Sequence, residues 1–147
     1  MWLNIFITIG TFFIMELVAW ATHKYLMHGL LWNLHKDHHQ VDRNNVLQKN
    51  DYFFLIFAIP GAMCIIDGIT FASPILFIGI GISLYGLAYF IVHEIFIHQR
   101  IKILKRTNFY YLRAIRKAHK VHHKNLEKEN GVCFGMLFVP FQYLKKD

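Results

Sequence analysis

Three long apolar segments dominate the pattern of hydrophobic and polar positions along the chain. They cover residues 2–22, 52–71 and 74–97, and each contains one acidic residue and no lysine or arginine. At about 1.5 Å of rise per residue, helices of these lengths cross a hydrocarbon core of roughly 30 Å. The alternative is a water-soluble bundle, but its helices would keep a polar stripe for solvent, and these segments have none. We therefore predict three membrane-spanning helices.

The sequences that border these segments indicate how the spans are connected. Residues 72–74, Ala-Ser-Pro, suit a tight turn, so the second and third spans are expected to form a helical hairpin. The first span has neither the basic start nor the small-residue cleavage site of a secretory signal peptide. We expect it to remain in the mature protein.

The net charge of +7 is distributed unevenly. Four Lys/Arg lie between residues 23 and 51, ten lie between 99 and 128, and two close the chain at 145–146. Basic residues confined between apolar segments are a topology signal and not a nucleic-acid footprint, so no nucleic-acid partner is expected. By the positive-inside rule the N-terminus lies outside, and segments 23–51 and 98–131 lie in the cytoplasm, as in a bacterial inner-membrane protein.

The polar region after the third span is predicted to contain an amphipathic helix over residues 109–124. One stripe holds Leu112, Ile115, His119 and His122, and the opposite stripe is basic, with Arg113, Arg116, Lys117, Lys120 and Lys124. Such a helix should lie along the membrane interface with its basic face toward water or lipid headgroups. Residues 132–144 are apolar but short for a span, and we expect them to form an interfacial or re-entrant cover over the polar region.

Composition supports a membrane protein and excludes other classes. The chain has 147 residues, 55% of them apolar and 17% charged, with a mean hydropathy of +0.32, which excludes a disordered or fibrous protein. Cys64 and Cys133 have no second sulfur at ligand spacing, so both thiols are expected to be free. The predicted fold class is an all-α integral membrane protein of one domain, residues 1–147, with about three transmembrane helices plus cytoplasmic interfacial helices.

Histidine carries the candidate chemistry. The ten histidines form four clusters: His23/His28, His35/His38/His39, His93/His98 and His119/His122/His123. Each H-x2-H-H triplet has the spacing that directs rings on one helix face toward a common point. In an H-x4-H pair the rings stand about 140° apart on an α-helix, so either the helix is distorted or the rings serve different ions. A pair followed by a triplet occurs twice, which makes a weak internal repeat.

Ten imidazoles are too many for one metal ion. Zinc takes three or four protein ligands, so we predict a site for two ions. Imidazole suits iron, copper, zinc and nickel alike, and spacing alone does not choose among them. An isolated histidine is usually a hydrogen-bonded interfacial residue, but that explanation does not account for ten histidines in four clusters.

Several motifs together resemble those of one family. They are Met15-Glu16, His23-Lys-Tyr-Leu-Met-His28-Gly29, His35-Lys-Asp-His38-His39, Asn50-Asp51, His93-Glu-Ile-Phe-Ile-His98-Gln-Arg100, Ala118-His119-Lys-Val-His122-His123 and Gly131-Val-Cys-Phe-Gly135. Over nearly its whole length the chain is similar to the bacterial β-carotene hydroxylases of the membrane fatty acid hydroxylase superfamily. The chain departs from the family pattern at Glu94, where Asp is usual, and at Gln48, where an acid is usual.

The resemblance implies a centre of two non-haem iron ions. Such a centre uses O₂ as co-substrate and adds oxygen at carbon 3 of each β-ionone ring, giving zeaxanthin by way of cryptoxanthin. All ten histidines are then candidate catalytic residues and metal ligands. Electrons are expected from an external ferredoxin-type carrier with its reductase, because Gly79-Ile-Gly81 resembles a dinucleotide loop only superficially and lies inside a span. The basic face over 113–124 suits an acidic carrier, or equally membrane lipid.

Acidic residues are expected to support the metal ligands. An all-imidazole site leaves positive charge on the metals, so nearby carboxylates should orient and polarise the rings. Asp37, Asp51 and Glu94 are the candidates, with a solvated interfacial acid as the alternative. Glu16 lies about 10 Å deeper than His23, so we expect it to bridge to another span. Asp67 is expected to reach water near the outer end, and neither of these two acids is a predicted ligand.

The substrate is expected to be a carotenoid that enters from the bilayer. Tyr85, Tyr89 and Phe90 can line its approach, although aromatic residues at such spacing more often serve packing. A related di-iron hydroxylase or desaturase acting on a sterol or fatty acyl chain is an alternative. A non-catalytic membrane metal-binding protein is another, but a transport path would need ligands at mid-membrane. A bis-histidine haem protein would need fewer histidines, placed deeper.

Overall fold

The computed structural model describes residues 1–40 and 47–144, and every regular element in these residues is a helix. The longer helices are α1 (Trp2–Ala21), α2 (Trp32–His39), α3 (Phe53–Thr70), α4 (Ile75–Tyr89) and α5 (Tyr110–His123). π-helical segments η1 (Thr22–Leu30) and η3 (Phe90–Ile97) continue α1 and α4, and short 3₁₀ segments occur at η2 (Lys49–Tyr52) and η4 (Phe141–Tyr143). The all-helical prediction is confirmed for these residues.

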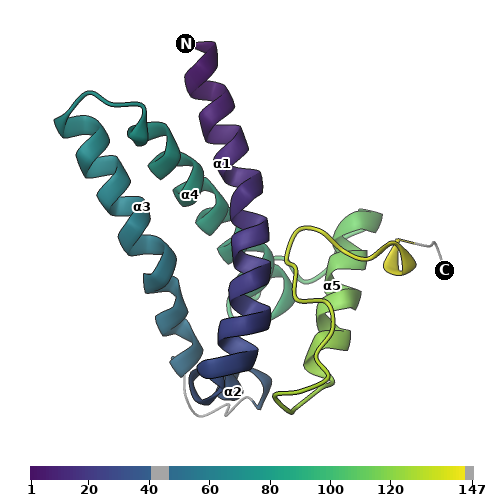
Figure 1. The fold of residues 1–147 in the computed structure, drawn as a ribbon. Coiled ribbons are helices and arrows are strands. Elements are labelled where there is room, and N and C mark those ends of the chain that lie inside the picture. Colours follow the sequence, from purple (N-terminus) through teal and green to yellow (C-terminus); the bar gives the residue numbers. More distant parts are fainter. Residues whose placement is uncertain (41–46, 145–147) are drawn as a thin grey trace.

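Three of the helical rods are long and apolar enough to cross a membrane. They cover Trp2–Leu30, Lys49–Thr70 and Ile75–Ile97. Helix α4 packs against both α3 and α1, and the N-terminus and the turn between α3 and α4 lie at the same end of the molecule, with α2 at the other end (Figure 1). The three predicted helices are therefore present with the length and composition that a span requires, and α3 and α4 form the predicted hairpin.

Two glycines of α4 allow this close packing. A Cβ at Gly79 would lie 2.7 Å from the Ile65 side chain of α3, and a Cβ at Gly81 would lie 2.7 Å from the Thr8 carbonyl oxygen of α1. Small residues are how membrane helices approach each other closely. The glycine pattern of α4 thus serves helix packing and does not form a dinucleotide-binding loop.

Glu16 ties the rods to the C-terminal segment. Its side chain is buried, one carboxylate oxygen accepts a hydrogen bond of 2.7 Å from the Tyr85 hydroxyl on α4, and the other accepts from the backbone N–H groups of Met136, Leu137 and Phe138 at 2.8–3.0 Å. The predicted bridge to another span is confirmed. Tyr85 is buried and its hydroxyl is bound to Glu16, so Tyr85 serves helix packing and does not line the approach of a substrate. Asp67 is exposed near the end of α3.

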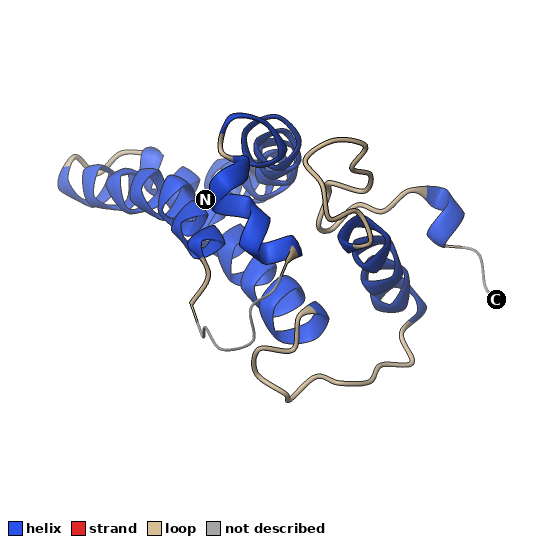
Figure 2. Cartoon of the chain, turned by 90° about the horizontal axis from the view of Figure 1, so that it is seen from below, coloured by secondary structure: helices blue, strands red, loops and turns tan. Residues whose placement is uncertain are grey.

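Helix α5 lies to one side of the three rods (Figure 2). It buries Ile115 against Phe96 and Ile97 of η3 and Met136 of the C-terminal segment. The predicted basic face is correct with one exception: Arg116 is half-buried, because its guanidinium stacks 3.8 Å above the Phe96 ring and donates to the Phe96 carbonyl oxygen. Residues 132–144 are mostly irregular. Met136, Leu137 and Phe138 are bound to Glu16 of α1, and the carbonyls of Val132 and Phe134 lie against His122 and His23, so the first part of the segment covers these histidines as predicted.

Candidate metal centre

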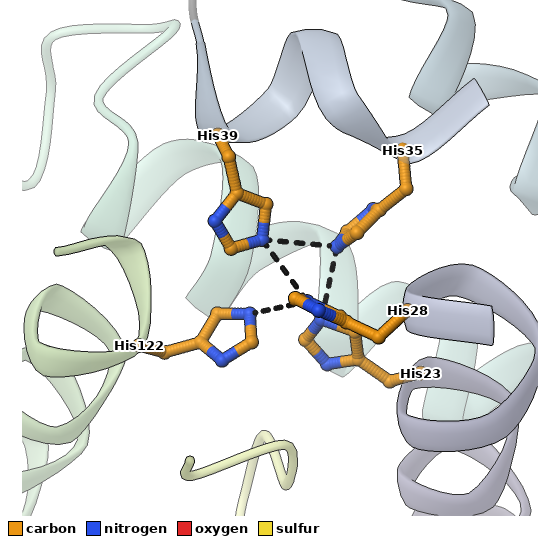
Figure 3. A group of neighbouring side chains, drawn as sticks. All are labelled: His23, His28, His35, His39 and His122. Atoms are coloured by element: carbon orange, nitrogen blue, oxygen red, sulfur yellow. Dashed lines mark hydrogen bonds between the residues drawn. The ribbon is translucent and has the colours of Figure 1, made fainter. Parts of the chain in front are cut away.

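The structure gathers the ten histidines into two groups of five. Group 1 consists of His23, His28, His35, His39 and His122, and group 2 consists of His38, His93, His98, His119 and His123. Within each group the nearest ring nitrogens all lie within 4.8 Å of one another. Figure 3 shows the five rings of group 1 pointing from η1, α2 and α5 toward one point. Each group can hold a metal ion.

The π-helical segments resolve the question raised by the H-x4-H pairs. His23 and His28 lie in η1, where the Leu31 N–H donates to the Leu26 carbonyl, and His93 lies in η3, where the His98 N–H donates to the His93 carbonyl at 2.9 Å. These are i to i+5 hydrogen bonds, which bring residues five apart onto the same helix face. The helix is therefore distorted at both pairs, and each pair contributes both rings to a single group.

The triplets behave differently from the expectation of one common point. His35 and His39 belong to group 1, but His38 belongs to group 2; His119 and His123 belong to group 2, but His122 belongs to group 1. Residues at i and i+4 are closer in direction around a helix than either is to i+3, so a triplet placed between two centres divides in this way. Each group thus consists of one pair, two rings of one triplet and the middle ring of the other. The two halves of the weak sequence repeat thus exchange one histidine each, since His38 joins the group of the second half and His122 joins the group of the first.

Oxygen atoms surround group 1 and fix its protonation. Every Nδ1 atom of the group faces a neutral oxygen at 2.6–3.1 Å, namely the carbonyls of Phe134, Lys128, Asn125 and Val132 and the Asn50 side-chain oxygen. An oxygen acceptor requires the ring to donate, so Nδ1 carries the proton. Each Nε2 is then a lone pair, and these lone pairs point inward.

The Nε2 atoms that face one another inside group 1 carry no proton, so they cannot hydrogen-bond to one another. In group 1 the Nε2 atoms of His23 and His35 are 3.1 Å apart, and those of His28 and His39 are 3.2 Å apart. In group 2 the buried Nε2 atom of His123 has no hydrogen-bond partner. Lone pairs at such separations repel unless a cation lies between them. The residues present therefore fit a bound metal ion in each group.

Burial keeps these imidazoles in the neutral form that binds metals. Desolvation lowers the pKa of His39 to about 4 and the pKa values of His98 and His122 to about 3. Neighbouring rings add to the effect, since a second positive charge nearby is unfavourable. At neutral pH the rings are ready for metal without first losing a proton.

Group 2 has a different outer environment. His93 Nδ1 lies 2.5 Å from a Glu94 carboxylate oxygen, and His38 Nδ1 donates to the Gln48 side-chain oxygen at 3.0 Å. Arg100 donates to Gln48 at 2.8 Å and pairs with Glu94 at 2.7 Å and with Asp51 at 2.8 Å. The outer contact expected from Glu94 is thus present, and the amide at position 48 makes its own contact although no acid stands there.

The other two predicted acids do not touch a histidine directly. Asp37 accepts hydrogen bonds from the backbone N–H groups of Lys49 and Asn50, and Asp51 accepts from Arg100 and from the Gln48 backbone. Both carboxylates therefore act indirectly. They hold the backbone of residues 48–50, and the side chains of Gln48 and Asn50 contact the histidines. Sequence reasoning missed Asn50 and Arg100 as contributors, although both stand in motifs that carry the family resemblance.

The fold and the histidine groups define a class: helical proteins with three segments able to span a membrane and two polyhistidine groups able to hold metal. The chain belongs to the fatty acid hydroxylase family, whose sequence model matches residues 8–145.

Curated relatives cover nearly the full chain. The "Beta-carotene hydroxylase" of Paracoccus sp. (strain N81106 / MBIC 01143) is 34% identical over 98% of this chain and 90% of its own length. The "Beta-carotene hydroxylase" of Pantoea ananas is 37% identical over 93% and 78%, respectively. The "Beta-carotene 3-hydroxylase 2, chloroplastic" of Arabidopsis thaliana is 31% identical over 91% and 45%. No solved structure matches the chain significantly. The similarity supports a membrane hydroxylase that uses metal.

Proposed function

We propose that this chain is a β-carotene 3-hydroxylase that depends on O₂ and two non-haem iron ions and converts β-carotene by way of β-cryptoxanthin to zeaxanthin. The observation that carries this proposal is the convergence of all ten histidines into two groups of five, in a chain similar over nearly its full length to bacterial β-carotene hydroxylases. The histidines of groups 1 and 2 are the proposed ligands of the two ions.

The protein supplies orientation around a reaction that side chains cannot perform. When bound, two iron ions supply the O₂-activating chemistry needed to break an unactivated C–H bond. The carbonyls of Phe134 and Val132 hold the Nδ1 protons of His23 and His122, so that both Nε2 lone pairs stay directed inward. Glu94 does the same for His93 in group 2.

An apolar pocket of about 480 Å³ offers a route for a substrate from the bilayer. Leu17 and Trp20 of α1 form one wall, and Phe134, Phe138 and Val139 contribute to the other. The Phe134 ring also contacts three rings of group 1, with its centroid 5.1–5.4 Å from theirs. We propose that the β-ionone ring approaches the centre along this pocket, beside Phe134.

Filling the pocket should block turnover without disturbing the metal centre. We expect Leu17→Trp to lower the rate of β-carotene conversion by more than about tenfold, because an indole occupies space that the substrate needs. Ile14→Trp, at an exposed position of the same helix outside the pocket, is the matched control. Pigment conversion and metal content are measured for both variants. Equal conversion by the two variants would show that the substrate takes another route.

The partners follow from charge and topology. We propose that a ferredoxin-type carrier, supplied by its reductase, delivers electrons at the exposed basic side chains of α5, since this helix also carries three of the histidines. Membrane lipid headgroups compete for the same side chains. The proposed location is the bacterial inner membrane, with the N-terminus outside and both histidine groups at the cytoplasmic face.

Pigment analysis tests the proposed activity. Expression of the chain in bacteria that accumulate β-carotene, together with a ferredoxin reductase system, should yield β-cryptoxanthin and zeaxanthin in extracts separated by liquid chromatography. Unaltered β-carotene, with the protein present in the membrane fraction, would refute the proposal. A hydroxylated or desaturated sterol or fatty acyl chain in the same cells would move the activity to a related substrate.

A further inference from the structure

The two histidine groups differ in the charge of the atoms that support them. All five Nδ1 partners in group 1 are neutral oxygens, four from the backbone and one from Asn50. In group 2, His93 is supported by the Glu94 carboxylate. Both groups consist of five imidazoles, so their inner donor atoms are of the same type, although His98 and His123 of group 2 are less buried than the rings of group 1. In charge, the groups differ at the outer atoms.

Arg100 holds this carboxylate in place without cancelling its charge. Its Nε pairs with one Glu94 oxygen at 2.7 Å, which leaves the other Glu94 oxygen on His93 Nδ1. The two terminal nitrogens of the guanidinium bond to Asp51 at 2.8 and 3.0 Å. One cation is therefore shared between two carboxylates, and the cluster beside group 2 has a net charge of −1. Gln48 joins the cluster and supports His38.

A carboxylate on the outer nitrogen of an imidazole makes the inner nitrogen a stronger donor to a metal. It also places a negative charge near a cation that the ligands themselves do not neutralise. We infer that Glu94, positioned by Arg100, makes group 2 the tighter of the two metal sites, so that the ions bind and leave in a fixed order. This inference rests on the proposed function only in requiring that both groups bind metal.

Chelator release from the purified full-length protein tests the order. The protein is loaded anaerobically with Fe²⁺ and challenged with a ferrous chelator, and the iron remaining is followed over time. We expect two phases of equal amplitude, the slow one from group 2. Glu94→Gln, which keeps the shape but removes the charge, should speed the slow phase by about 10–100-fold and leave the fast phase unchanged.

Gln48→Glu is the matched variant with the opposite sign. In the wild type the Gln48 side-chain oxygen accepts hydrogen bonds from both His38 and Arg100, and a carboxylate oxygen at this position can accept the same two bonds. The added negative charge should then make the slow phase slower. His28→Ala, which removes a group 1 ligand, should abolish the fast phase and keep the slow one, and so assigns the phases.

The outcomes separate this inference from the proposed function. Release of both ions in one phase, or a change in the fast phase upon Glu94→Gln, would overturn the inference while the di-iron proposal stands. A wild-type protein that binds no iron would overturn both. Slow-phase rates that rise in Glu94→Gln and fall in Gln48→Glu would establish that the outer charge sets the order.

Discussion

Replacement of His38 by alanine is expected to abolish turnover. His38 Nε2 lies 3.2 Å from His93 Nε2, so the substitution removes one of the five nitrogens of group 2. Loss of an outer partner already costs about 10–100-fold in metal affinity, and loss of the ligand itself should cost more. Zeaxanthin formation should fall below detection, and the iron of group 2 should be lost.

The exchange of histidines between the groups makes this prediction specific. His38→Ala should empty group 2, although His35 and His39 on the same helix serve group 1, and His122→Ala should empty group 1 instead. Lys36→Ala, at an exposed position of α2, is the control and should behave as wild type. Iron content and pigment conversion are measured for all three. Retained turnover in His38→Ala would remove this residue from the ligand set.

Removal of the Glu16 carboxylate is expected to detach the C-terminal segment. Glu16→Ala leaves three backbone N–H groups and the Tyr85 hydroxyl without their acceptor, and each unsatisfied buried donor costs about 1–3 kcal/mol. The released segment carries the carbonyls of Phe134 and Val132, which orient two group 1 rings. We therefore expect faster proteolysis within residues 124–144 and loss of the group 1 iron.

Tyr85→Phe provides a graded comparison. It removes one of the four donors to Glu16 and leaves the three backbone bonds, so proteolysis and iron content should change less than in Glu16→Ala. If Glu16→Ala matches wild type in both measurements, the carboxylate does not hold the cover, and its burial needs another explanation.

The architecture was predictable because it depends on composition over long windows. A segment of about 20 apolar residues without Lys or Arg predicts a long apolar helix from its own composition, independently of the residues around it. Residues 109–124 alternate basic and buried positions at the helical period, which is why a helix with one buried and one basic face forms over nearly the predicted residues, Tyr110–His123. Arg116 is less exposed than the rest of the basic face because its guanidinium stacks on the ring of Phe96, a residue 20 positions earlier in the sequence, and such a contact is not visible in the helical pattern.

The division of the histidines was not predictable from spacing. For the H-x4-H pairs, spacing left two possibilities open, a distorted helix or rings that serve different ions. The π-helical segments at both pairs show that the first is correct, and only the three-dimensional structure could decide between them. The triplets divide because two centres lie beside one helix, which only the tertiary arrangement reveals.

The outer contacts show the same limit. Asn50 supports His35 through its side-chain oxygen, but an asparagine beside an aspartate carries no sequence signal for that role. Reasoning from charge selected Asp37 and Asp51, whereas in the structure both carboxylates accept hydrogen bonds from the backbone of residues 48–50. Glu94 was predictable because it follows His93 directly, at a position where a carboxylate can reach the outer ring nitrogen.

Elemental analysis of purified, active protein tests the central claim most directly. Two groups of five inward nitrogens predict two iron ions per chain, bound in the wild type and reduced to one in either His38→Ala or His122→Ala. Active protein that contains no iron, or that contains two ions after loss of either histidine, would contradict the account.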